Sequence, residues 1–114
     1  MSSGFSKFAY GTEAAQYAFA NIAASQTAAA VVAAVAGKKI RVLAVAFVCG
    51  ATATNATFNS DSGAISCLFA NAANAGAVLG LNPVGWFETD EGEALTLTTG
   101  TGSTTGVQVV YATH

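Results

Sequence analysis

One run dominates the hydrophobic pattern of the chain: Lys38–Cys49, which reads KKIRVLAVAFVC. Alternate side chains of a strand point to opposite faces, and here both faces are apolar apart from Arg41 at the entry. A half-exposed strand would alternate apolar with polar positions, so the run predicts a central strand covered on both faces, by the core and by another sheet or subunit. It is too short to cross a bilayer as a helix, which takes ~20 apolar residues. The two predicted faces are Ile40, Val42, Ala44, Ala46 and Val48, and Leu43, Val45, Phe47 and Cys49.

The preceding segment, Glu13–Gly37, fits two structures. It is rich in alanine, the best helix former, and the residues from Gly37 to Lys39 resemble a helix C-terminus. Small and larger side chains alternate from residue 16 to 21, however, and the later valines are β-branched, which favours strands. We predict strands at Gln16–Ile22 and Thr27–Val35, with a tight Gly37-Lys38 hairpin into the central strand; a helix is the alternative.

Short apolar runs separated by turn residues continue to the end of the chain. A strand at Ala56–Ser60 is predicted to form a hairpin with Ile65–Ala70, and Asn71–Asn82 is a loop with room for a short helix or strand. This pattern predicts an all-β fold, an antiparallel jelly-roll-like β-sandwich of about 7–8 short strands. The remaining predicted strands are Gly85–Thr89, Ala94–Thr98 and Val107–Tyr111.

The chain divides into an N-terminal arm, residues 1–11, and a single β-sandwich domain, residues 12–114. The arm consists of small residues punctuated by Phe5, Phe8 and Tyr10. A terminal arm is normally disordered unless something holds it. These aromatic side chains either pack on their own domain or reach into a neighbour, and we expect the arm to serve docking rather than folding.

The composition indicates an assembly subunit. Charged residues make up 9% of the chain and hydrophobic residues 53%, against ~25% charged residues in an ordinary globular domain. Solubility relies on interspersed charge, so such a surface predicts burial in a homo-oligomer, most simply a homotrimer. Four Lys and Arg residues at a net charge of -2 cannot form a phosphate-binding stripe, so we expect no nucleic-acid partner. We also expect no membrane partner, because the longest apolar run is too short to span a bilayer, and no secretory signal is recognisable at the start of the chain.

Residues that could carry out chemistry are few. His114 is the single histidine and the last residue, which we interpret as a frayed terminus. The acidic residues between Glu88 and Glu93 bracket a turn without the spacing of a calcium loop. Cys49 and Cys67 lie on apolar stretches and are predicted to be buried free thiols, with a disulfide between them as the alternative. We therefore expect no enzymatic activity, no cofactor and no metal site.

Two adjacent aromatic residues, Trp86 and Phe87, stand on one predicted strand. Neighbouring positions of a strand face opposite ways, so one of the two is predicted to lie in the core and the other at an interface. The candidate interface residues are Phe5, Phe8, Tyr10, Trp86 and Phe87.

The C-terminal half contains the step Gly85-Trp86-Phe87-Glu88-Thr89, a turn, Gly92-Glu93-Ala94-Leu95 and the strand Val107–Tyr111; Val31–Phe47 has a similar strand–turn–strand character. In these segments the chain resembles small structural proteins of tailed bacteriophages. The resemblance implies a capsid decoration (cement) protein, a trimeric β-sandwich on the capsid exterior that binds the major capsid protein and stabilises the shell. It also implies synthesis in the host cytoplasm. A tail-fibre or receptor- and glycan-binding module is the alternative, since similar motifs recur there.

Overall fold

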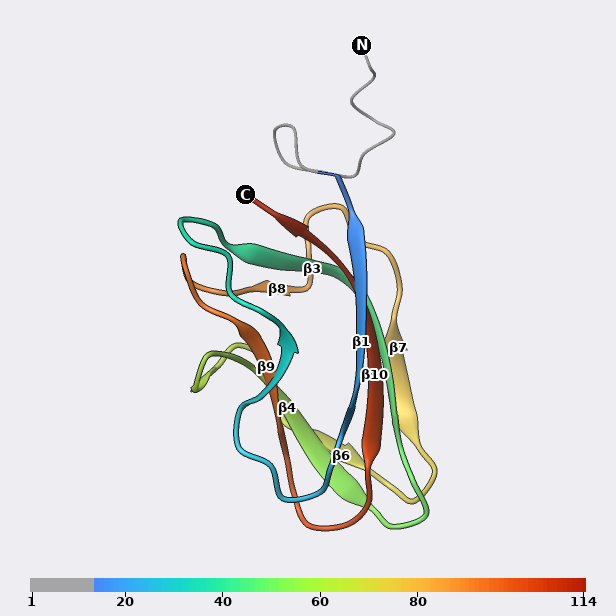
Figure 1. Ribbon diagram of the computed structural model, residues 1–114. Helices are drawn as coiled ribbons and strands as arrows, with labels where there is room; N and C mark the ends of the chain where they lie inside the picture. The colour runs from blue at the N-terminus through green and yellow to red at the C-terminus, as the bar shows by residue number, and fades with distance from the viewer. Residues whose placement is uncertain (1–13) are drawn as a thin grey trace.

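The computed structural model describes residues 14–114 and arranges them as two antiparallel β-sheets that pack face to face (Figure 1). This part of the chain contains no helix, and hence none that could span a membrane. The predicted all-β sandwich is confirmed. Sheet A contains, in spatial order, β1 (Gln16–Ile22), β10 (Thr105–Thr113), β3 (Ile40–Cys49) and β7 (Gly76–Leu79), with β8 (Phe87–Glu88) also paired to β3. Sheet B contains β2 (Ala29–Val32), β9 (Leu95–Thr99), β4 (Thr54–Ser60) and β5 (Gly63–Ala64), with β6 (Phe69–Asn71) also paired to β4.

Neighbouring strands of each sheet come from distant parts of the sequence. β1 pairs with β10, so that Gln16 stands opposite Tyr111, and β10 pairs in turn with β3. The chain changes sheet at each step from β1 to β4. Such exchange between two sheets occurs in jelly rolls, so the strand order favours the jelly-roll assignment, which stays a prediction. The arm predicted at residues 1–11 lies outside the described residues.

The core lies between the sheets and is organised around four phenylalanines. Phe58 is completely buried and stacks on Phe87, with ring centroids 5.0 Å apart. Phe47 meets Phe58 and Phe69 edge to face, at 5.8 and 4.8 Å. Because Phe47 and Phe87 belong to sheet A and Phe58 and Phe69 to sheet B, the aromatic cluster joins the two layers.

The central strand β3 contains a β-bulge that the sequence pattern did not predict. Val42 stands opposite Tyr111 and Ala44 opposite Val110, so Leu43 is an extra residue with no partner on β10. An extra residue shifts the alternation by one position, so the faces of the strand exchange beyond it. Ile40 and Val42 face the core before the bulge. After it Val45 and Phe47 do so, and the prediction that Ala44, Ala46 and Val48 share the face of Ile40 is wrong.

Several predicted strands are confirmed, and others change partner or length. The alanine-rich segment forms strands, and β1 has the predicted bounds Gln16–Ile22. The hairpin from this segment into β3 is wrong: Gly37 has a φ of 72° and Lys38 N–H donates to the Val35 carbonyl, but β2 pairs with β9 in the other sheet. Ile65–Ala70 is not one strand; β4 pairs first with β5 and then with β6.

Candidate functional site

The outer face of sheet A, turned away from the core, carries three rows of side chains that follow the strand register. The central row runs across four strands as Phe19, Gln108, Ala46 and Val78. The rows on either side of it are Tyr17, Val110 and Ala44, and Asn21, Gly106, Val48 and Gly76. We call these eleven residues the outer face of sheet A.

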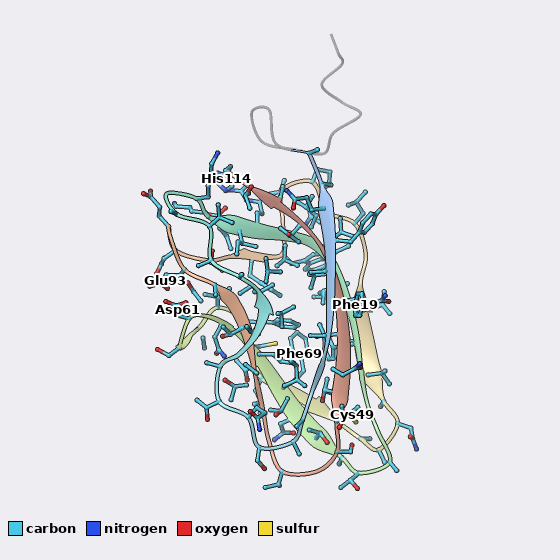
Figure 2. The ribbon with its side chains drawn as sticks, in the orientation of Figure 1. Phe19, Cys49, Asp61, Phe69, Glu93 and His114 are labelled. Carbon is cyan, nitrogen blue, oxygen red and sulfur yellow. The ribbon has the colours of Figure 1, made fainter. Side chains whose placement is uncertain are left out.

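Large apolar side chains of this face are open to solvent. Tyr17 is 86% exposed, Phe19 75% and Val78 78%, and Val48 on the central strand is 52% exposed. Figure 2 shows Phe19 on the outer side of sheet A and Phe69 between the two sheets. Single exposed apolar residues are common on protein surfaces, whereas a contiguous apolar patch marks a contact site. Tyr17 and Phe19 lie on β1, and Val48 and Val78 lie on the paired strands β3 and β7. β10 separates the two pairs, and the shorter side chains of Val110 and Ala44, together with Gln108 and Ala46, continue the patch between them.

The face is hollowed because its middle consists of small residues. Ala44, Ala46 and Gly106 form the floor, and Phe19 and Val78 stand at the sides. Gly76 has no side chain to fill the hollow beside it. A Cβ at this position would overlap the backbone carbonyl of Phe47, so a larger residue would disrupt the pairing of β3 with β7. Two adjoining hollows result, of about 390 and 410 Å³.

Charge is separated from this face. None of the described residues that line the two hollows is charged, and Gln108 and Asn21 are their polar side chains. Within residues 14–114 the charged side chains occupy three parts of the sequence: residues 38–41, Asp61 and residues 88–93. Figure 2 shows Asp61 and Glu93 on the opposite side of the sandwich from Phe19, and His114 at the end where the C-terminus lies.

Glu88 is the centre of a cluster of charged side chains near the C-terminus. Its carboxylate accepts a hydrogen bond from Arg41 Nε at 2.6 Å, lies 2.7 Å from His114 Nε2, and is 3.8 Å from Lys39 Nζ. His114 is therefore not a frayed terminus: its N–H donates to the Lys39 carbonyl and its carbonyl accepts from Lys39 N–H, extending the β3–β10 ladder. Burial raises the pKa of Glu88, but the hydrogen bonds and positive charges of His114 and Arg41 outweigh burial and hold the pKa below its ordinary value of 4.5.

This shift predicts acid sensitivity. A carboxyl group whose pKa is lower in the folded than in the unfolded state stabilises the fold above its unfolded pKa, and the contribution is lost as the pH falls below about 4.5 through the folded pKa. Urea unfolding followed by circular dichroism at pH 6 and pH 3 should show a smaller loss of stability for Glu88→Gln than for the unmodified protein. Glu91→Gln, on an exposed turn position, is the matched control. Identical pH dependence in all three proteins would contradict the assignment.

Two of the other acidic residues, Glu93 and Asp61, hydrogen-bond to neighbouring parts of the fold. Glu93 accepts a hydrogen bond from the Ser60 hydroxyl at 2.6 Å, and Asp61 accepts from the Ala94 N–H at 2.9 Å. Across residues 14–114 no three His, Cys, Asp or Glu side chains converge in a way that could hold a metal ion. Both cysteines are free thiols, and Cys49 is buried as predicted. The prediction that Cys67 is buried is wrong, because its side chain is exposed.

The structure separates the five predicted interface residues. Phe87 packs against the core, whereas Trp86 is 45% exposed and its indole N–H donates to the Gly80 carbonyl at 2.7 Å. One residue of the pair thus faces inward and the other outward, as predicted. Phe5, Phe8 and Tyr10 lie outside the described residues.

Sequence reasoning missed the residues that the structure places at the centre of the outer face, Tyr17, Phe19 and Val78. The signal was present in β1, where Tyr17 and Phe19 alternate with Ala18 and Ala20. Large side chains are normally assigned to the core, but here the alanines face it. Because the alanines of this strand face the core, its aromatic residues face outward and are available for a contact outside the domain.

The chain matches no protein family, no curated protein and no solved structure. Its geometry therefore has to carry the functional argument. An uncharged, shallow, apolar face on a rigid sheet is suited to binding another polypeptide surface, because it offers apolar area and few directional polar groups.

Proposed function

We propose that the protein is a structural subunit that forms a homo-oligomer, most simply a trimer, and decorates the outside of a bacteriophage head. The observation that carries the proposal is the contiguous apolar outer face of sheet A, with Tyr17, Phe19 and Val78 each at least three-quarters exposed. In a lone subunit this area stays in water, and its burial in an assembly is favourable by ~25 cal/mol per Å².

The composition supports the same proposal. At 9% charged residues the surface has little charge to keep subunits apart. Among residues 14–114, no charged side chain lines the two hollows of the apolar face. Small side chains such as Ala44, Ala46 and Gly106 lose little conformational entropy when a partner covers them. The resemblance of the segment from Gly85 to Leu95 to phage structural proteins supplies the specific setting, with the major capsid protein as partner.

The proposal predicts that the protein stabilises the shell. A ligand that binds only the assembled shell favours that state by mass action, and many lattice sites multiply the effect. Heads assembled from the major capsid protein of the same virus should rupture at a higher temperature with the protein bound than without it. Light scattering or electron microscopy against temperature measures the difference.

Two controls make this result decisive. Co-sedimentation shows whether the protein is on the heads, and native mass spectrometry of the isolated protein gives its oligomeric state. Equal rupture temperatures with the protein demonstrably bound would remove the cement role, and a stable monomer at micromolar concentration would remove the homo-oligomer.

One observation favours a second candidate, a fibre or glycan-binding module. Trp86, Val84 and the Arg41–Glu88 pair line a separate hollow of about 220 Å³ beside β8. An exposed aromatic ring next to charged hydrogen-bonding groups is an arrangement that can hold a sugar. Binding of the isolated protein to a glycan array, without binding to heads, would favour this candidate.

A further inference from the structure

The two hollows of the outer face form one short groove with two aromatic-sized positions. They share Phe19, Ala46, Val78 and Gln108, and one extends toward the row of Tyr17 and the other toward the row of Asn21. Successive rows are two residues apart on each strand, which is about 6.7 Å at the rise of an antiparallel strand. An occupant with two apolar side chains at this spacing would therefore fill both positions.

The outer face by itself is too small for a stable flat interface. Three strand-to-strand spacings of about 4.8 Å and a height of about seven residues give roughly 14 by 23 Å, or about 330 Å². A typical stable interface buries about 800 Å² on each partner. The assembly rests on further contact area, which residues outside the described sandwich can supply.

The chain has a segment of suitable chemistry at its beginning. Thirteen residues precede the described part, and Phe8 and Tyr10 within them are two positions apart. On an extended segment, side chains two apart point the same way and are about 6.7 Å apart, which matches the two positions of the groove. The intervening residue, Ala9, is small, and the groove requires no charged partner.

We propose that residues 1–13 of a neighbouring copy occupy the groove on the outer face of sheet A, with Phe8 and Tyr10 seated in its two hollows. This inference rests on the proposed homo-oligomer and identifies one contact between its subunits. Mutual exchange of such segments adds buried area to each subunit contact without enlarging the sheet.

The proposed homo-oligomer is the reason for assigning the segment to a neighbouring copy, because its subunits have to cover the outer face of sheet A. β1 begins at the end of the sandwich where the C-terminus also lies (Figure 1). Five residues separate Tyr10 from Gln16, which is enough for a turn. The experiment below therefore distinguishes a neighbouring copy from the same chain.

Mixed disulfide trapping tests this contact in the full-length chain. In a Cys67→Ser background, one preparation carries Phe8→Cys and the other Ala46→Cys, because Ala46 is shared by both hollows. The two are mixed, allowed to exchange subunits and oxidised. We expect a mixed covalent dimer on a non-reducing gel, identified by mass, at roughly tenfold or more the yield of the control, since docking raises the effective concentration of the thiols to about the millimolar range.

The control pairs Phe8→Cys with Ala64→Cys, an exposed position on β5 of the opposite sheet. A mixed dimer no more abundant than in this control overturns the proposal. So does a chain carrying both Phe8→Cys and Ala46→Cys that forms its disulfide only within itself, because the occupant would then be its own segment. Native mass spectrometry of the reduced variants distinguishes failure of the segment exchange from failure of the homo-oligomer. Oligomers that do not form the mixed disulfide would overturn the segment exchange alone. Monomers would overturn the proposed homo-oligomer as well.

Discussion

Replacing Phe58 by alanine is expected to remove most of the stability of the sandwich. Phe58 is completely buried in sheet B, and its ring contacts Phe47 and Phe87 of sheet A and Phe69 of its own sheet. Its truncation leaves a cavity where the two layers meet. Phe→Ala changes at such sites cost about 3–5 kcal/mol. Domains of this size are stable by only about 5–15 kcal/mol, so the variant should be partly unfolded or close to it.

Urea unfolding at one fixed protein concentration measures this loss, because the stability of an oligomer depends on concentration. Leu68→Ala is the matched control, since that large apolar side chain is 60% exposed and surface changes stay within about 0.5 kcal/mol. Phe58→Leu should lie between the two, because it retains part of the buried volume. If Phe58→Ala loses no more stability than Leu68→Ala, the aromatic cluster does not hold the sheets together.

The core and most strands could be predicted from local patterns, because they depend on alternation. β1 has the predicted bounds, and β3 begins and ends within the predicted run. In β10, Val107 and Val109 face the core and Gln108 faces out, as strict alternation requires. The alanine-rich N-terminal segment follows its alternation and not its helix propensity, because the inward face of β1 has a sheet to pack against.

What could not be predicted depends on contacts between distant residues. The bulge at Leu43 is defined only by its pairing with β10, about 70 residues later, and it decides which side of β3 meets solvent. β2 begins only at Ala29, directly after Ala28, whose φ of 51° interrupts an extended strand. The segment pairs with β9 rather than with its sequence neighbour β3. The candidate site has the same origin: Phe19, Ala46 and Val78 become a row only when β1, β3 and β7 lie in one sheet.

Placing a carboxylate on the groove floor is expected to dissociate the assembly while leaving the subunit folded. Ala46 lies on the central strand, in the row between Gln108 and Val78, and lines both hollows. In the lone subunit its side chain is half-buried and points outward, so Ala46→Glu can keep its charge in water. Under a partner the same charge would be buried without a counter-ion among the described lining residues.

Leaving an unpaired charge at a covered interface costs about 3–5 kcal/mol, and each 1.4 kcal/mol changes a dissociation constant about tenfold. Ala46→Glu should therefore weaken self-association by roughly two to three and a half orders of magnitude, with an unchanged circular dichroism spectrum. Sedimentation across a concentration series measures the shift. Ala64→Glu introduces the same charge at an exposed position of β5 in sheet B and should leave association unchanged. Equal association of both variants would show that the outer face of sheet A is not the subunit contact. A carboxylate at position 46 cannot be covered by a partner without the free-energy cost of burying an unpaired charge.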